Sequence, residues 1–295
     1  MSEITSLFSS LPLLGYAFIP IAAYAAYGLL LWMMGGHGRE EARAVWLRSV
    51  IAAATVAFAL LASVWVGYAV GVYVNATNAA DAEVRCLSHF KNATADLNLV
   101  KYSAVVDKAL KCADSEFQSK FSALKEVYIN VFRASAIAGA VPVVSSWGMG
   151  VFQAAMPMSG AASGALMALA VAMAAAKVVY GFVLLMGLGA FLLATERLSP
   201  LGALILAVGM VFPAALAGAA DAIKGIPFHS GNFWEWVLSI LGGLWRSLDW
   251  GALIDDTKYA ALITTYIATA LSLASAATAA VTYALSRVAQ HLSVE

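Results

Sequence analysis

The chain has 295 residues, of which 62% are hydrophobic and only 12% are charged. Soluble domains are nearer half apolar and a quarter charged, so this composition excludes an ordinary soluble protein and indicates an integral membrane protein. The formal net charge is zero, so no overall basic field argues for nucleic-acid binding.

Two apolar segments open the chain, at residues 11–34 and about 45–74. Apolar runs of about twenty residues match the thickness of a bilayer, so residues 1–74 are expected to form the first two transmembrane helices. No Lys or Arg precedes Arg39, so the basic region of a cleavable signal peptide is missing and the first segment is expected to be retained.

The character of the chain changes over residues 75–130, where acidic and basic side chains are balanced. Two N-x-T sequons, at Asn75 and Asn92, share this stretch with the chain's two cysteines, Cys86 and Cys112. Glycosylation acceptors need an exterior face, and disulfides persist mainly in oxidising compartments. We therefore expect an exterior subdomain, glycosylated at both sequons and closed by a Cys86–Cys112 disulfide worth roughly 3 kcal/mol in the chain-entropy model.

The same stretch is expected to be mostly helical, because apolar side chains recur at helical spacing at Phe117, Phe121, Leu124 and Tyr128. Residues 131–160 are apolar but interrupted by prolines, glycines and serines. Irregular backbone at membrane depth is tolerated only against protein or water, so we favour an interfacial or re-entrant element over a sixth span. The Gly/Ser/Met-rich run at 145–164 is either a mobile gate or a linker.

Residues 161–295 are expected to hold three further spans, at 161–193, 201–220 and about 260–289. The third follows an exterior loop at 221–259 whose tryptophans are typical of a belt at a membrane face. Small and hydroxyl residues in the last span suit close helix packing.

The predicted fold is thus an all-α polytopic membrane protein of the plasma membrane, with about five spans, the N-terminus outside and the C-terminus inside. A sixth span at 131–160 would reverse everything after it. Basic residues in short interior turns accord with the positive-inside rule. The residues expected at the cytoplasmic face are Arg39, Arg43, Arg48, Arg197 and Arg287.

No catalytic or nucleotide-binding motif stands out, and the four histidines lie on different segments, so no enzymatic activity, cofactor or metal site is expected. Lys177 is the strongest single candidate for a functional residue, since it lies in the middle of an expected span and a cation at the bilayer centre costs at least about 2.5 kcal/mol. It either lines an aqueous path or anion cavity, or snorkels to the outer headgroups. Asp221 and Lys224 are expected at a solvated helix end, and Asp255 and Asp256 just before the last helix, where they complement its dipole.

This layout resembles the polytopic inner-membrane subunit of type IV secretion and conjugation machines, the VirB-six/TrbL family. The likeness rests on the 75–130 loop and on residues 191–202, Phe-Leu-Leu-Ala-Thr-Glu-Arg-Leu-Ser-Pro-Leu-Gly, with the apolar run that follows. The sequons favour the archaeal branch, the CedA-like proteins of DNA import.

The resemblance implies a channel or scaffold subunit that forms a ring-shaped homo-oligomer in membrane lipid and passes single-stranded DNA. It also implies small membrane or pilin-like subunits and a separate cytoplasmic ATPase as partners. A small-solute secondary transporter is the alternative, although no internal repeat of the kind such proteins often carry is visible.

Overall fold

The computed structural model describes residues 13–36, 38–54, 57, 86–93, 99–140, 145–193, 198–227 and 250–294, and every element within them is helical. This confirms the all-α fold class. The elements, in chain order, are α2 (Leu13–Met33), the 3₁₀ helix η1 (Leu87–Ala93), α4 (Leu99–Ala140), α5 (Ser145–Leu184), α6 (Met186–Leu193), α7 (Ser199–Lys224) and α9 (Trp250–Val294). Residues 38–54 form a further helix after α2.

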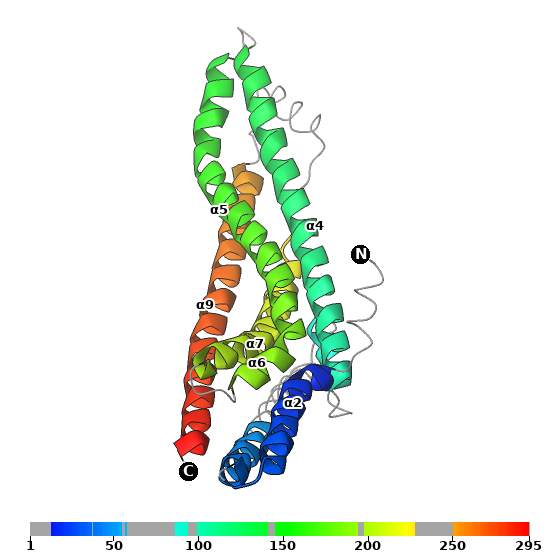
Figure 1. The fold of residues 1–295 in the computed structure, drawn as a ribbon. Coiled ribbons are helices and arrows are strands. Elements are labelled where there is room, and N and C mark those ends of the chain that lie inside the picture. Colours follow the sequence, from blue (N-terminus) through cyan, green and yellow to red (C-terminus); the bar gives the residue numbers. More distant parts are fainter. Residues whose placement is uncertain are drawn as a thin grey trace.

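Two long antiparallel helices, α4 and α5, form a hairpin that projects beyond the other helices at one end of the molecule (Figure 1). They contain 42 and 40 residues, so each is about 60 Å long, roughly twice the thickness of a bilayer's hydrocarbon core. The edge-on contact of Phe132 with Phe152, ring centroids 5.8 Å apart, sets the register near the tip. Helical spacing creates the buried face of α4, which consists of Val106, Ala109, Leu110, Ala113, Phe117, Leu124 and Val127.

The α6–α7 contact depends on glycines that let the two helix backbones approach closely. A Cβ added to Gly202 of α7 would collide with the Leu193 nitrogen and the Gly189 oxygen, and one on Gly189 would lie 2.8 Å from Ile205. Further along α7, a Cβ on Gly209 would lie 2.9 Å from the Met186 side chain. Small residues at such positions are typical of helix packing in membranes.

A second, shorter hairpin joins α2 to the helix at 38–54. The rings of Trp32 and Trp46 stack with centroids 5.4 Å apart, and Trp46 Nε1 donates a hydrogen bond to the Ala25 carbonyl at 3.2 Å. The Arg39 guanidinium lies 5.4 Å from the Trp32 ring centroid. The turn of this hairpin lies at the end of the molecule where α9 finishes, opposite the α4–α5 tip (Figure 1).

Three helical segments are long and apolar enough to cross a membrane: Met156–Leu184, Ser199–Lys224 and Ile254–Arg287. They correspond to the last three of the five expected spans. The first expected span contains a shorter apolar helix, Ile21–Met33, and most of the second lies outside the described residues.

Two stretches differ from the sequence-based expectation. Residues 131–160 have no separate element, because α4 continues to Ala140 and α5 begins at Ser145. The proposed gate or linker at 145–164 is therefore continuous helix, and Pro157 is accommodated inside it. The expected exterior loop at 221–259 begins inside α7 and ends inside α9, while residues 228–249 lie outside the described part.

Candidate functional site

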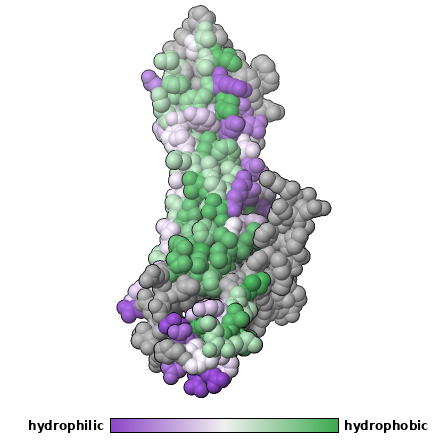
Figure 2. All heavy atoms as spheres, in the orientation of Figure 1, coloured by the Kyte–Doolittle hydropathy of each residue, from purple (hydrophilic) through white to green (hydrophobic). Residues whose placement is uncertain are grey.

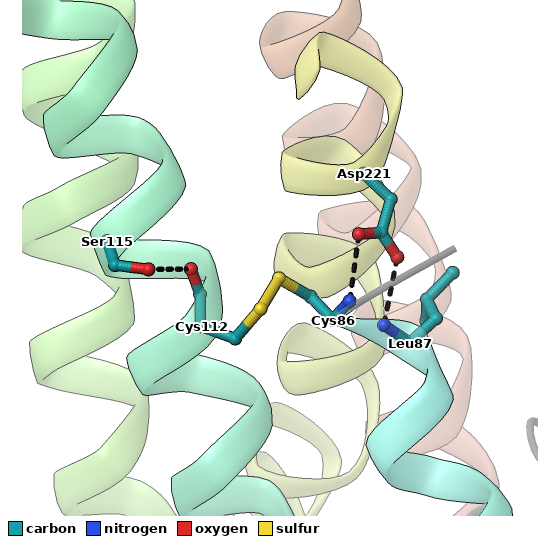
Figure 3. The surroundings of a disulfide bond; sticks show 5 residues. All are labelled: Cys86, Leu87, Cys112, Ser115 and Asp221. Carbon is teal, nitrogen blue, oxygen red and sulfur yellow. Dashed lines mark hydrogen bonds between the residues drawn. A yellow bond between two sulfur atoms is a disulfide. The ribbon is translucent and has the colours of Figure 1, made fainter. Parts of the chain in front are cut away.

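Helices α4, η1 and α7 meet at a disulfide between Cys86, just before η1, and Cys112 on α4 (Figure 3). The two Cα atoms are 5.4 Å apart, well within the range for a disulfide, and Cys86 is fully buried. The Ser115 hydroxyl donates a hydrogen bond to the Cys112 carbonyl at 2.7 Å. These are the two cysteines that the sequence analysis paired.

The carboxylate of Asp221, in the last turn of α7, binds the start of η1 with both oxygens. The backbone N–H of Cys86 donates to Oδ1 at 2.8 Å, and that of Leu87 donates to Oδ2 at 2.9 Å (Figure 3). The first N–H groups of a helix have no intrahelical acceptor and carry partial positive charge, so a carboxylate stabilises them. The expectation of a solvated helix end is wrong for Asp221, which is half-buried and hydrogen-bonded.

A third link joins α4 to the chain just after α7. Lys120 Nζ donates a hydrogen bond to the Ile226 carbonyl at 2.7 Å. Partial burial lowers the pKa of Lys120 below its usual value of 10.5, and the nearby carboxylate of Glu116 acts in the opposite direction. We call the disulfide, the Asp221 bonds and the Lys120 bond together the clamp.

The face of α4 that points away from the core is polar. Lys108 and Lys111 are exposed near Cys112, and Lys125 and Glu126 are exposed farther along the helix. Lys111 and Asp107 form an ion pair at 2.7 Å, with side-chain exposures of 76% and 26%. The hydrogen bond that Lys111 Nζ donates to the Asp107 carboxylate, followed by the negative charge of Asp107, raises the pKa of Lys111. Figure 2 shows hydrophilic residues gathered along the side where α4 runs, next to a hydrophobic surface over α5.

Lys177 lies on α5 with its side chain exposed. Tyr180, one helical turn later, is close enough to Lys111 to contribute electrostatically to its raised pKa. Residues three apart share one flank of a helix, so Lys177 is placed on the flank of α5 that adjoins α4. The structure thereby associates Lys177 with charged residues that the sequence analysis assigned to a separate exterior loop.

The remaining expected site residues are spread over the molecule. Asn92 is in η1, whereas Asn75 and Arg197 lie outside the described residues. Arg39, Arg43 and Arg48 are exposed on the helix at 38–54. Arg287 is exposed near the end of α9, with its guanidinium 5.4 Å from the Tyr283 ring centroid.

Asp255 and Asp256 do not precede the last helix as expected, because α9 begins at Trp250 and includes both. Asp255 forms an ion pair with Lys258 at 3.1 Å, and Asp256 is fully buried. Within the described residues, no group of three or more His, Cys, Asp or Glu side chains is arranged to hold a metal ion.

Sequence reasoning missed the tertiary role of Asp221 and the Lys120 bond. Its one available signal was that Asp221 is the first charged residue after the long apolar run of α7. Neither a protein-family model, nor a curated protein, nor a solved structure matches this chain. By the length and composition of its three apolar segments, the chain has the character of a helical membrane protein.

Proposed function

We propose that this protein is a channel or scaffold subunit of a machine that moves single-stranded DNA across the plasma membrane. The observation that carries the proposal is the position of the charged outer face of α4 beside the apolar helices. Such a chain offers one surface for lipid and one surface for water at the same level along the helices. A subunit that borders an aqueous passage requires both surfaces.

The proposed orientation has five spans, with the N-terminus outside and the C-terminus inside. The disulfide between Cys86 and Cys112 supports an exterior position for the clamp, because disulfides persist mainly in oxidising compartments. The start of the helix at 38–54, which carries Arg39, and the end of α9, which carries Arg287, lie at the end of the molecule opposite the α4–α5 tip (Figure 1). Basic residues gathered at that end accord with a cytoplasmic face.

In the part of the chain that the structure describes, the polar face follows α4, and such a stripe does not enclose a passage by itself. We therefore propose a ring of identical subunits, with the α4 faces turned toward a shared centre and the apolar faces of α5 and α9 toward lipid. The sequence has no phosphate-binding loop motif, so the proposed machine takes its energy from a separate cytoplasmic ATPase. Small membrane or pilin-like subunits complete the assembly in this proposal.

The decisive experiment deletes the gene in its own host and measures the exchange of marked DNA between strains. Loss of exchange, with rescue by the wild-type gene, is the expected result. Unchanged exchange in the deletion strain would reject the proposal. Uptake of a labelled small solute by purified protein in vesicles, together with normal DNA exchange, would instead support a secondary transporter.

A further inference from the structure

We infer that the first part of α4 and the adjoining flank of α5 line a water-filled, net positive vestibule, sunk into the outer half of the membrane and open on the clamp side. The inference deepens the proposed function. It rests on the placement of α7 as a transmembrane span with the clamp outside, but it does not depend on DNA being the cargo.

The depth of the vestibule follows from how α4 is attached to α7. Asp221 is joined through Cys86 to Cys112, and Ile226 is bound by Lys120. The two helices therefore run in the same direction, with this part of α4 beside the last turn of α7. Since α4 begins at Leu99, it extends about 20 Å below the clamp along α7, which is more than half of a hydrocarbon core of about 30 Å.

Lys177 lies at a depth between that of Leu99 and that of the clamp. A Cβ on Gly209 of α7 would lie 3.7 Å from the Phe182 carbonyl oxygen, which places this end of α5 beside the middle of α7. Because α5 runs opposite to α7, Lys177 lies about 7 Å from Phe182 toward the clamp, below the level of Asp221. Lys177 therefore lies below the outer boundary that the end of α7 defines.

Charged groups at this depth require water. A charged side chain facing hydrocarbon costs at least about 2.5 kcal/mol, and several such groups lie on one flank of the bundle. The described side chains from Leu99 to Cys112, together with Lys177, include three exposed lysines and one aspartate. The aspartate already pairs with one of the lysines. The charged members of this lining are Lys108, Lys111, Lys177 and Asp107.

The net positive charge makes anions the favoured solutes. A cleft lined by one sign of charge with low-dielectric walls concentrates ions of the opposite sign. The chemical class that fits is a small or extended anion, such as the phosphate groups of a polyanion. A neutral solute would gain nothing from the three lysines.

Cysteine accessibility tests this inference directly. The described cysteines form the disulfide and none is free, so each introduced thiol is the one that reacts. Lys108→Cys and Lys177→Cys are placed in the proposed vestibule, and Val178→Cys is the matched control. Val178 follows Lys177 on α5 and is 58% exposed, and the helical rotation of about 100° per residue turns it away from the flank that Lys177 occupies. Each variant is expressed in intact cells and treated from outside with charged, membrane-impermeant methanethiosulfonate reagents.

Both vestibule variants should react at least about tenfold faster than Val178→Cys, because charged reagents are excluded from hydrocarbon as charged side chains are. The ratio of the rate of the anionic reagent to that of the cationic reagent should be higher at both lysine positions than with a free thiol in solution. Reaction of both lysine positions as slowly as Val178→Cys, or only after permeabilisation, would overturn the vestibule. Fast reaction of the introduced thiols, together with unchanged DNA exchange in the strain that lacks the gene, would retain the vestibule and reject the DNA cargo.

Discussion

The two carboxylate oxygens of Asp221 accept the backbone N–H groups of Cys86 and Leu87, so the end of α7 caps the start of η1. Asp221 and Cys86 are 135 positions apart in the sequence. The disulfide from Cys86 to Cys112 extends the connection to α4, which means that one carboxylate and one covalent bond fix three elements to one another.

Removal of the Asp221 carboxylate should therefore destabilise the fold. Hydrogen bonds to charged groups contribute about 1.5–3 kcal/mol each when fully buried. Because Asp221 is only half-buried, loss of both bonds in Asp221→Ala is expected to lower the free energy of unfolding by about 2–3 kcal/mol in total. Asp221→Asn keeps one acceptor oxygen and should lose about half as much. Denaturant unfolding in detergent, followed by circular dichroism, measures the change. Asp255→Ala, at an exposed ion pair with Lys258, is the control and should cost less than about 1 kcal/mol. Equal effects of the two alanine variants would contradict the capping role.

The disulfide should contribute by a comparable amount. It links residues separated by 26 positions, for which the loss of loop entropy in the unfolded chain predicts about 3 kcal/mol. Unfolding of the Cys86→Ser/Cys112→Ser double variant should match that of the reduced wild type. Adding Asp221→Ala to the double variant should cost less than it does in the wild type, because the start of η1 is then held less firmly. Strict additivity would show that the two contacts act independently.

The glycine contact between α6 and α7 should not tolerate a side chain. Gly202→Ala forces a methyl group against the Leu193 and Gly189 backbones, which cannot move as a flexible side chain can. A loss of about 1–3 kcal/mol is expected from such overpacking. Gly181→Ala on α5 meets no atom within 4 Å and should be neutral or should stabilise by up to about 1 kcal/mol through helix propensity. Thermal unfolding in detergent compares the two, and a stable Gly202→Ala protein would argue against the close approach.

Lys120 should make stability depend on alkaline pH. Burial lowers the pKa of its folded-state ammonium below 10.5, so the unfolded chain binds this proton more tightly than the folded chain does. The penalty on the folded state is present at neutral pH and is relieved as the pH rises from the folded pKa toward 10.5. Lys120→Met removes both this penalty and the bond to the Ile226 carbonyl. The free energy of unfolding of the wild type should therefore increase relative to that of the variant as the pH rises.

Unfolding at matched pH values from neutral to alkaline measures that difference. Lys125→Met is the control, because Lys125 is exposed on the same helix. If the free energy of unfolding of the wild type, taken relative to that of Lys120→Met, stays constant or falls as the pH rises, the assignment is contradicted.

Local patterns predicted the features that depend on local chemistry. With two cysteines in the sequence, only one pairing within the chain was available, and the structure forms it. Helical spacing at Phe117 and Leu124 correctly predicted a helix, and the structure shows that both side chains are buried. The apolar run of α7 was also recognised, and Ser199 and Lys224 extend it by only a few residues at each end.

Features that depend on tertiary contact were not readable from the sequence. Residues 131–160 contain Gly, Ser and Pro, which favour interruption locally, but pairing of Phe132 with Phe152 keeps both arms helical as one hairpin. Asp221 looked like a solvated end because its partners are backbone N–H groups far away in the sequence. The start of α9 was misplaced because Asp255 and Asp256 were assigned to the segment before the helix, whereas they lie in its second turn and do not mark the boundary.

The central claim is that the clamp lies outside the cell and the turn after α2 lies inside. Labelling of intact cells with an impermeant maleimide tests it most directly, using Lys125→Cys on the exposed face of α4 and Arg43→Cys on the exposed face of the helix at 38–54. The account predicts labelling of Lys125→Cys in intact cells and of Arg43→Cys only after permeabilisation. Labelling in the reverse pattern would contradict it.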